Sequence, residues 1–366
     1  MKKLNFKDLL GIFIVWRCSL LLFSFFALYL LGGFLNPQKV NFLAALSSWD
    51  GGHFISIAQN GYQAPEQYAF FPLYPLLIKA LAPVFLNNFR LAALFISSLF
   101  SLLAIVFFQK LASIDYKNGE VKKSIIFLLA SPVAFFLAAA YAESLFVFLA
   151  CASFYFSRSQ RWVWAGVFAS FASAAKPFGI LLFIVLVFEY LKQKNFKIKK
   201  VDWKILLVFI APCGLLFYMA FLKFKLGNAF FFIVSESNWQ RQFIAFAPKV
   251  VFEKYLSVFS LENIGTRFFA QQALELFSVI FFIVILVYSV KKLRSTYVLY
   301  CILLLLLALS TGVLTSFPRF FLLAFPLFFA LPSFCQGRLF EKFLLYNFVL
   351  FQGLFLALFL TGIWVA

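Results

Sequence analysis

Residues 9–35 read LLGIFIVWRCSLLLFSFFALYLLGGFL, an apolar run in which Arg17 is the single charged residue. A helix needs about 20 apolar residues to cross the hydrocarbon core of a bilayer, and this run is long enough. It is also longer than the apolar core of a cleavable signal peptide, which has about 7–15 residues. We therefore expect a retained first membrane span near residues 9–33.

Similar apolar runs recur along all 366 residues of the chain. Hydrophobic residues make up 64% of the sequence, and the mean hydropathy is +0.97. Repeated runs of this length are typical of polytopic helical membrane proteins. The sequence therefore predicts an all-α fold that forms one integral membrane domain over residues 1–366.

The chain carries a formal net charge of +19. In a soluble protein this excess would indicate a nucleic-acid partner. Here Lys and Arg gather in short loops between apolar runs, as the positive-inside rule describes, so we expect membrane lipids and no nucleic acid as partners. The five cysteines lie far apart without CxxC spacing, and neither a disulfide nor a zinc site is predicted.

Six basic clusters set the expected topology: Lys2/Lys3/Lys7, Lys110/Lys117/Lys122/Lys123, Arg158/Arg161, Lys192–Lys204, Lys291/Lys292/Arg294 and Arg338/Lys342. If all six face the cytoplasm, each successive pair must enclose an even number of spans. About 11 spans satisfy this condition, near 9–33, 89–109, 122–140, 143–158, 162–175, 178–191, 204–224, 271–290, 296–315, 320–334 and 343–364. The N-terminus is then inside, and the long loops 34–88 and 225–270 are outside.

The apolar segment 70–85 does not fit as a span. It is short and contains Pro72, Pro75, Lys79 and Pro83. A span here would also move every later basic cluster to the other side of the membrane. We expect a half-buried or re-entrant helix that packs on protein.

Asp50 is the leading candidate for a functional residue. It lies in SSWDGGHF, residues 47–54, directly after the first span, in a chain with only 13 acidic residues. Carboxylates at membrane boundaries are functional candidates by default. Ser47 or Ser48 can cap a short helix near 49–60, with Trp49 as an interfacial anchor and His53 one turn after Asp50. The alternative is that Asp50 only caps this helix.

Few other polar residues are expected on the same outer side, which would assemble a site at one end of the bundle. They are Glu66, Glu143, Lys176, Glu236, Trp239, Arg241 and Arg319. Lys176 and Arg319 suit an anionic ligand, and arginine suits phosphate best. The alternatives are that Glu143 begins a helix and that the two cations extend to lipid headgroups.

The sequence has no GxxxxGK[ST] loop and no GxGxxG motif, so no nucleotide cradle is predicted. His53 is the only histidine, which excludes a multi-histidine metal site. A base, several cations and apolar walls suit a substrate that is activated by a lipid phosphate. The phosphate would bind the cations, and the lipid tail would lie among the helices. The carboxylate could then deprotonate an acceptor hydroxyl. No metal cofactor is expected, with a divalent ion left open as the alternative.

Several segments, in order along the chain, resemble the PIG-V family of mannosyltransferases, which have the GT-C membrane fold. The most specific is WDGGHF at 49–54, followed by AFFPLYP at 69–75, which contains Tyr74. Further matches are SP at 131–132, AYAESLF at 140–146, GNAF at 227–230, WQR at 239–241 and PRF at 318–320. The resemblance covers about residues 49–326.

The resemblance implies a GT-C helical bundle that transfers mannose, with inversion, from polyprenyl- or dolichyl-phosphate-mannose to a lipid or glycan hydroxyl. It implies Asp50 as catalytic base and Glu143 as a residue lining the site. The chain is similar in size to bacterial members of the family, which implies a site on the outer face of the plasma membrane. A eukaryotic source would instead place the site in the lumen of the endoplasmic reticulum. Two alternatives stay open: a transporter or flippase of an anionic lipid or solute, and a GT-C enzyme that glycosylates protein hydroxyls.

Overall fold

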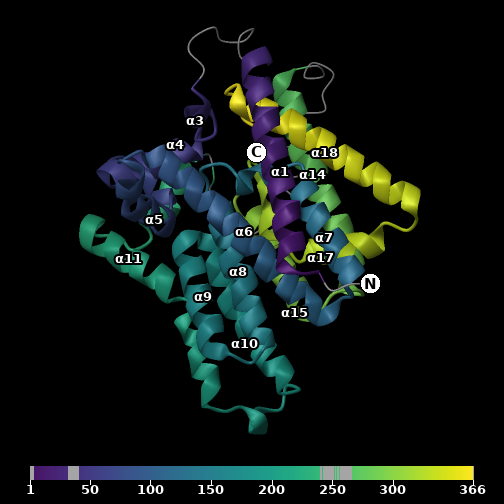
Figure 1. The fold of residues 1–366 in the computed structure, drawn as a ribbon. Helices are drawn as coiled ribbons and strands as arrows, with labels where there is room; N and C mark the ends of the chain where they lie inside the picture. The colour runs from purple at the N-terminus through teal and green to yellow at the C-terminus, as the bar shows by residue number, and fades with distance from the viewer. Residues whose placement is uncertain are drawn as a thin grey trace.

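The structure, a computed structural model, describes residues 4–31, 41–239, 241, 251, 253, 255 and 266–365. Within these ranges every regular element is a helix, which confirms the all-α prediction (Figure 1). The helices α6, α8, α9 and α10 lie side by side, and α1 crosses in front of the bundle in this view. Further helices at the predicted spans surround them.

The predicted spans coincide with helices in position but not always in length. The helices at these positions are α1 (Phe6–Phe26), α6 (Phe89–Asp115), α7 (Asn118–Ala130), α8 (Glu143–Arg158), α9 (Trp162–Ala175), α10 (Leu181–Gln193), α11 (Cys213–Leu226), α14 (Arg267–Val290), α15 (Ser295–Leu309), α16 (Phe317–Leu323), α17 (Leu327–Phe334) and α18 (Arg338–Leu360). Segment 122–140 is divided between α7 and a 3₁₀ turn at Ala134–Leu137, and 320–334 is divided between α16 and α17.

The count of about 11 spans is not confirmed. Among the described residues, four helices are long and apolar enough to cross a bilayer: Phe6–Leu30, Phe89–Asp115, Phe269–Val290 and Arg338–Leu360. Two bent pairs raise the count to six if each pair is one span, with bends of 46° after Ile210 and 92° after Leu323. The others are short: α8 has 16 residues, which gives a length of about 24 Å at 1.5 Å per residue.

The segment after residue 41 forms short helices rather than spans. The predicted helix at 49–60 is confirmed as α4 (Asp50–Asn60), which ends at Gly61 with a φ of 74°. The predicted cap is wrong, because Trp49 precedes the helix without a side-chain cap and the Ser47 hydroxyl donates back to the carbonyl of Leu43. Segment 70–85 is also a short helix, α5 (Leu73–Leu81) with a 3₁₀ turn at Ala82–Phe85, and it packs on α4 and α6.

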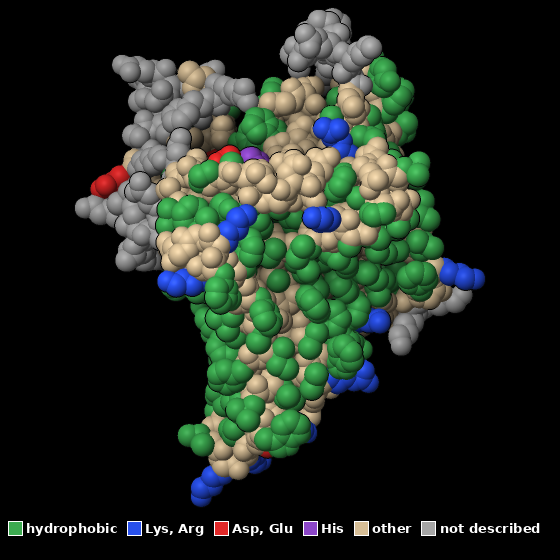
Figure 2. All heavy atoms as spheres, turned by 90° about the vertical axis from the view of Figure 1, so that its left-hand side faces the viewer, with side chains coloured by type: hydrophobic (Ala, Val, Ile, Leu, Met, Phe, Trp, Pro, Cys, Tyr) green, Lys and Arg blue, Asp and Glu red, His purple; other side chains and the backbone are tan. Residues whose placement is uncertain are grey.

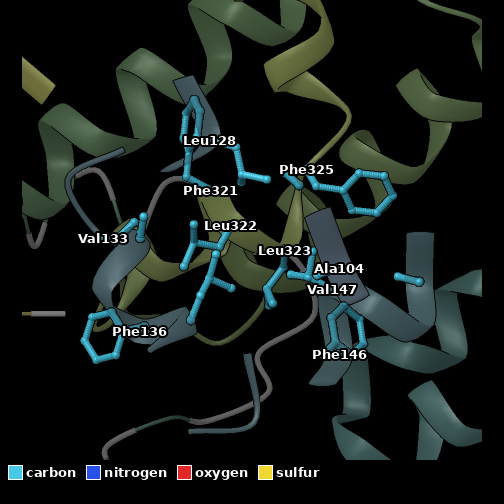
Figure 3. Close-up of a cluster of buried hydrophobic side chains, with 14 of the residues drawn as sticks. Ala104, Leu128, Val133, Phe136, Phe146, Val147, Phe321, Leu322, Leu323 and Phe325 are labelled. Atoms are coloured by element: carbon cyan, nitrogen blue, oxygen red, sulfur yellow. The ribbon is translucent and has the colours of Figure 1, made fainter. Parts of the chain in front are cut away.

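The core around α16 is apolar and closely packed. Side chains of α6, α7, α8 and α16 meet in Figure 3, with Leu322 and Leu323 in the middle of the group. All seven residues of α16 are buried. This packing fixes the position of the helix that carries Arg319.

The described residues of the six basic clusters, which do not include Lys2 and Lys3, lie at one end of the molecule, as the predicted topology requires. Ion pairs and hydrogen bonds join them: Lys123 to Glu341 at 2.6 Å, Arg158 to Asp115 at 2.5 Å, Arg294 to Glu189 at 2.7 Å, Lys192 to Ser295, and Gln109 to the carbonyl of Leu4 at 2.8 Å. Hydrophobic side chains cover much of the tapering lower body on the face in Figure 2, and Lys and Arg lie at its lower tip.

Helix α8 connects this basic end to the opposite end. It begins at Glu143 and ends at Arg158, which belongs to the basic end. The next helix, α9, returns and ends just before Lys176. Glu143 and Lys176 therefore lie together at the end away from the basic clusters.

Helix α11 packs closely against α9 at Gly214. A methyl group on this residue would lie 2.0 Å from the carbonyl oxygen of Ser170, which is backbone and cannot easily move. We expect Gly214→Ala to lower the free energy of unfolding by about 1–3 kcal/mol. The check is the midpoint of thermal unfolding of the purified protein in detergent.

Gly11 is the matched control for this substitution. It also lies within a helix, but a methyl group there would meet no atom within 4 Å. Gly11→Ala should leave the midpoint unchanged or raise it, because alanine favours a helix over glycine. Equal midpoints for the two variants would show that α9 and α11 are not in this close contact.

Candidate active site

Asp50 is held at the start of α4 by contacts with the loop before α8. The amide of Ala140 donates to the carbonyl of Leu46 at 3.1 Å, and the Tyr141 hydroxyl donates to the carbonyl of Ser48 at 3.1 Å. A side chain on Gly51 would approach the carbonyl oxygen of Ala140 to 3.2 Å, so this position needs a glycine or a shift of the loop. The sequence Asp50-Gly51 thus brings a carboxylate and a close backbone contact together.

Two carboxylates and two cations form a chain of ion pairs beside this loop. Arg319 Nη1 lies 2.6 Å from Asp50 Oδ2 and 3.6 Å from Glu143 Oε1. Lys176 Nζ lies 2.8 Å from the same oxygen of Glu143. Glu143 is 1% exposed, and its second oxygen has no hydrogen-bond partner among the described residues.

The guanidinium of Arg319 is fixed on several sides. Its Nη2 donates to the hydroxyl of Ser316 at 2.9 Å. Its central carbon lies 5.2 Å from the ring centre of Phe136, 5.6 Å from that of Tyr141 and 5.2 Å from that of Trp364. Because Arg319 is only 8% exposed, it does not extend to lipid headgroups, and that alternative is wrong.

The environment of Asp50 keeps its carboxyl group ionised. Burial raises the pKa of this group, because the charged form loses its hydration. The charge and hydrogen bond of Arg319, with the charges of Lys176 and Arg241, outweigh burial and hold the pKa below its ordinary value. Asp50 is therefore a carboxylate at neutral pH and can accept a proton.

These groups line a cavity of about 320 Å³, which we call the catalytic cavity. A third ion pair also lines it: Arg241 lies 3.1 Å from Glu236 and also donates to the carbonyl of Thr315 at 3.1 Å. The lining residues thus include three carboxylates, Asp50, Glu143 and Glu236, and three cations, Lys176, Arg241 and Arg319. Each cation has a carboxylate partner, so the cavity is close to electrically neutral.

Aromatic side chains form other parts of the cavity wall. The ring of His53 stacks on Phe70 at 4.9 Å and meets Trp239 edge-on at 5.4 Å. Trp49 and Trp364 meet edge-on at 5.2 Å. These two groups give the polar centre apolar borders, as is usual in small-molecule sites.

The structure brings most of the predicted site residues together. Lining the catalytic cavity are Trp49, Asp50, His53, Glu143, Lys176, Trp239, Arg241 and Arg319. Glu66 and Tyr74 do not line it. Tyr74 is fully buried, and its hydroxyl is bonded to Ser97 at 2.8 Å and to the carbonyl of Ala93 at 3.1 Å.

Trp364 was not predicted, although it lies in the cavity wall and against Arg319. The only signal in the sequence was its place at the outer end of the last predicted span. Ser316 and Thr315 were also missed, since small polar residues before a proline are common in loops. Among the described residues there is no group of three or more His, Cys, Asp or Glu that could hold a metal ion.

Comparison with known proteins gives the same family as these residues indicated. Residues 20–349 match the family described as Mannosyltransferase (PIG-V). GPI alpha-1,6-mannosyltransferase 2 of Rattus norvegicus is 31% identical over 151 residues, which are 38% of this chain and 30% of that protein. The Homo sapiens protein of the same name is 31% identical over 161 residues, 41% of this chain and 32% of its own length.

The matched stretches thus span about a third of these curated relatives. No solved structure matches the chain. The family match, in contrast, covers most of the chain and includes every residue of the three ion pairs. The chain therefore belongs to the PIG-V family of mannosyltransferases.

Proposed function

We propose that this protein is a membrane glycosyltransferase that moves mannose from a polyprenyl- or dolichyl-phosphate-linked donor to an acceptor hydroxyl. The observation that carries the proposal is the carboxyl group of Asp50 at 2.6 Å from Arg319, in a cavity with two further cations. A carboxylate supplies the base, and the cations supply partners for a phosphate. Family membership supports mannose as the sugar.

In the proposed reaction Asp50 takes the proton of the acceptor hydroxyl as its oxygen attacks the anomeric carbon. The new carbon–oxygen bond forms while the bond from that carbon to the phosphate oxygen breaks. The electron pair of the broken bond stays on the lipid phosphate, which gains one negative charge. A single displacement of this kind inverts the configuration at the anomeric carbon.

Arg319 is suited to stabilise the departing phosphate. In the resting cavity it is paired with Asp50. When Asp50 accepts the proton it becomes neutral, and the charge of Arg319 is then available to the phosphate as its second negative charge develops. Preorganised cations of this kind are a major source of rate enhancement in water-poor sites.

The expected location follows from the two ends of the molecule. The basic clusters lie at the end away from the catalytic cavity. If the basic end is cytoplasmic, as the positive-inside rule predicts, the site faces the outside of a plasma membrane or the lumen of the endoplasmic reticulum. The partners are then a lipid-linked sugar donor and a lipid or glycan acceptor.

Sugar transfer by the purified protein in liposomes tests the proposal. With radiolabelled, β-linked polyprenyl-phosphate-mannose as donor, we expect an α-mannosyl product on octyl mannoside, identified by glycosidase digestion. GDP-mannose should give no product, since no nucleotide cradle is predicted. A serine-containing peptide serves as the second acceptor. Comparing the two acceptors shows whether the protein modifies glycan hydroxyls or protein hydroxyls.

The transporter alternative predicts a different outcome in the same liposomes. Movement of fluorescent polyprenyl phosphate between leaflets, without any labelled product, would support it and overturn the enzymatic proposal. The polar residues of the catalytic cavity lie at one end of the bundle, whereas transporter sites lie near the midplane. We therefore expect transfer.

A further inference from the structure

A second cavity of about 200 Å³, which we call the side cavity, adjoins the catalytic cavity. Six residues line both: Pro177, Phe178, Glu236, Arg241, Thr315 and Phe320. Arg241 is therefore at the boundary, with the polar centre on one side and the side cavity on the other.

The rest of the side cavity is lined almost entirely by hydrophobic side chains. It is enclosed by α11, α15, α16 and the short helix α12 (Phe231–Ser235), with Leu215, Phe232, Leu307 and Phe317 among its lining residues. Thr311 is the single polar residue beyond the shared boundary, and its hydroxyl can donate to the carbonyl of Ala308 at 2.9 Å or to that of Val313 at 3.0 Å. An apolar ligand would therefore leave the Thr311 hydroxyl with a hydrogen-bond partner.

We propose that the side cavity binds the first isoprene units of the lipid donor, with the phosphate at Arg241 and the mannose toward Asp50. The inference rests on the proposed function. In such a donor the phosphate is bonded to the sugar on one side and to the isoprenoid on the other. The order of groups in the protein is the same: the base, the cations, and then an apolar wall that begins at Arg241.

A larger apolar cavity cannot take this part of the donor. It has a volume of about 800 Å³ and lies against α5, α9 and α11, but it shares no lining residue with the catalytic cavity. A buried aromatic cluster lies between them, in which the hydroxyl of Tyr218 donates to the carbonyl of Tyr68 at 2.7 Å and Phe71 packs on Tyr218. A phosphate at Arg241 cannot have its first isoprene unit on the far side of this cluster.

Photo-crosslinking of the unmodified protein tests the proposal directly. The probe is a polyprenyl phosphate without sugar, with a diazirine on its first isoprene unit. We expect labelled peptides from 178–180, 232–233 and 307–317, and excess unlabelled polyprenyl phosphate should prevent the labelling. Labelling of 167–174 or 72–76, or of neither cavity, would overturn the proposal.

A variant whose larger side chain fills the side cavity provides a second test, in which the KM for the donor is measured. Leu307→Trp should raise the KM for polyprenyl-phosphate-mannose about tenfold, the effect of roughly two methylene groups left unburied. The kcat and the KM for the acceptor should not change. Phe171→Trp, in the larger cavity, is the matched control and should leave all three constants unchanged; a higher donor KM in this variant alone would contradict the assignment.

The two proposals fail in different ways. Labelling at the side cavity in a protein that transfers no sugar would support the lipid-binding site and contradict the proposed enzymatic function. Transfer with labelling elsewhere would keep the enzyme and reject this lipid site.

Discussion

Asp50→Asn is expected to lower the kcat of mannosyl transfer by a factor on the order of 10²–10⁴, the usual loss when a general base is removed. The amide of asparagine has nearly the same shape as the carboxylate but cannot take the proton of the acceptor. Because the acceptor and donor should still bind, their KM values are expected to change little. Initial rates with polyprenyl-phosphate-mannose and octyl mannoside give both constants.

Two variants separate this effect from a loss of structure. Asp50→Glu keeps a carboxylate in the cavity and should retain more activity than Asp50→Asn. Asp8→Asn makes the same chemical change at an exposed position on α1 and should leave kcat unchanged. Full activity of a folded Asp50→Asn protein would assign the base to another residue.

Arg319→Gln is expected to lower kcat by a factor on the order of 10²–10³, the typical cost of a lost transition-state partner. The substitution should also change the pH dependence of kcat/KM. As the proposed base, Asp50 would act only when ionised, so kcat/KM should fall as the pH falls through its pKa. In the wild type Arg319 holds this pKa below the ordinary value, so activity should persist down to weakly acidic pH.

In Arg319→Gln the burial of Asp50 remains while its strongest partner is lost. The pKa of Asp50 should therefore rise, and the acid limb of kcat/KM should move to higher pH. Arg319→Lys, which keeps the charge, should show a smaller displacement. Arg90→Gln removes an exposed arginine of α6 and is the control. An acid limb that stays in place would show that Arg319 does not control the ionisation of Asp50.

The positions of the helices followed from the apolar runs, because a run of about 20 residues has few alternatives in a membrane. The breaks carry a partial signal, because Pro212 lies in the 46° bend after Ile210 and Pro326 lies in the 92° bend after Leu323. Proline marks the place of a bend but does not set its angle. The angle depends on packing against other helices, here the buried side chains around α16, and this packing is not visible in a single apolar run.

The candidate site could be predicted in membership but not in pairing. Scarcity of charge made Asp50, Glu143 and Arg319 conspicuous, and topology brought them to one side. The sequence could not show which cation, Arg319 or Lys176, pairs with Asp50. That choice depends on distances of a few ångströms. Two predicted residues, Glu66 and Tyr74, lie outside the cavity. Tyr74 was chosen from a family motif, and such a motif contains structural residues as well as catalytic ones. Glu66 was chosen only because its loop was expected on the outer side, and the side of the membrane does not place a residue in the cavity.

The three matched ion pairs of the catalytic cavity have a consequence for how much the surroundings must respond to the reaction. In the proposed reaction one negative charge disappears from Asp50 while another appears on the phosphate, so the net charge of the cavity stays the same. The change is a short displacement of charge among fixed groups, so lipid and water outside need little dielectric reorganisation. A low-dielectric setting at the edge of a bilayer then becomes an advantage for catalysis.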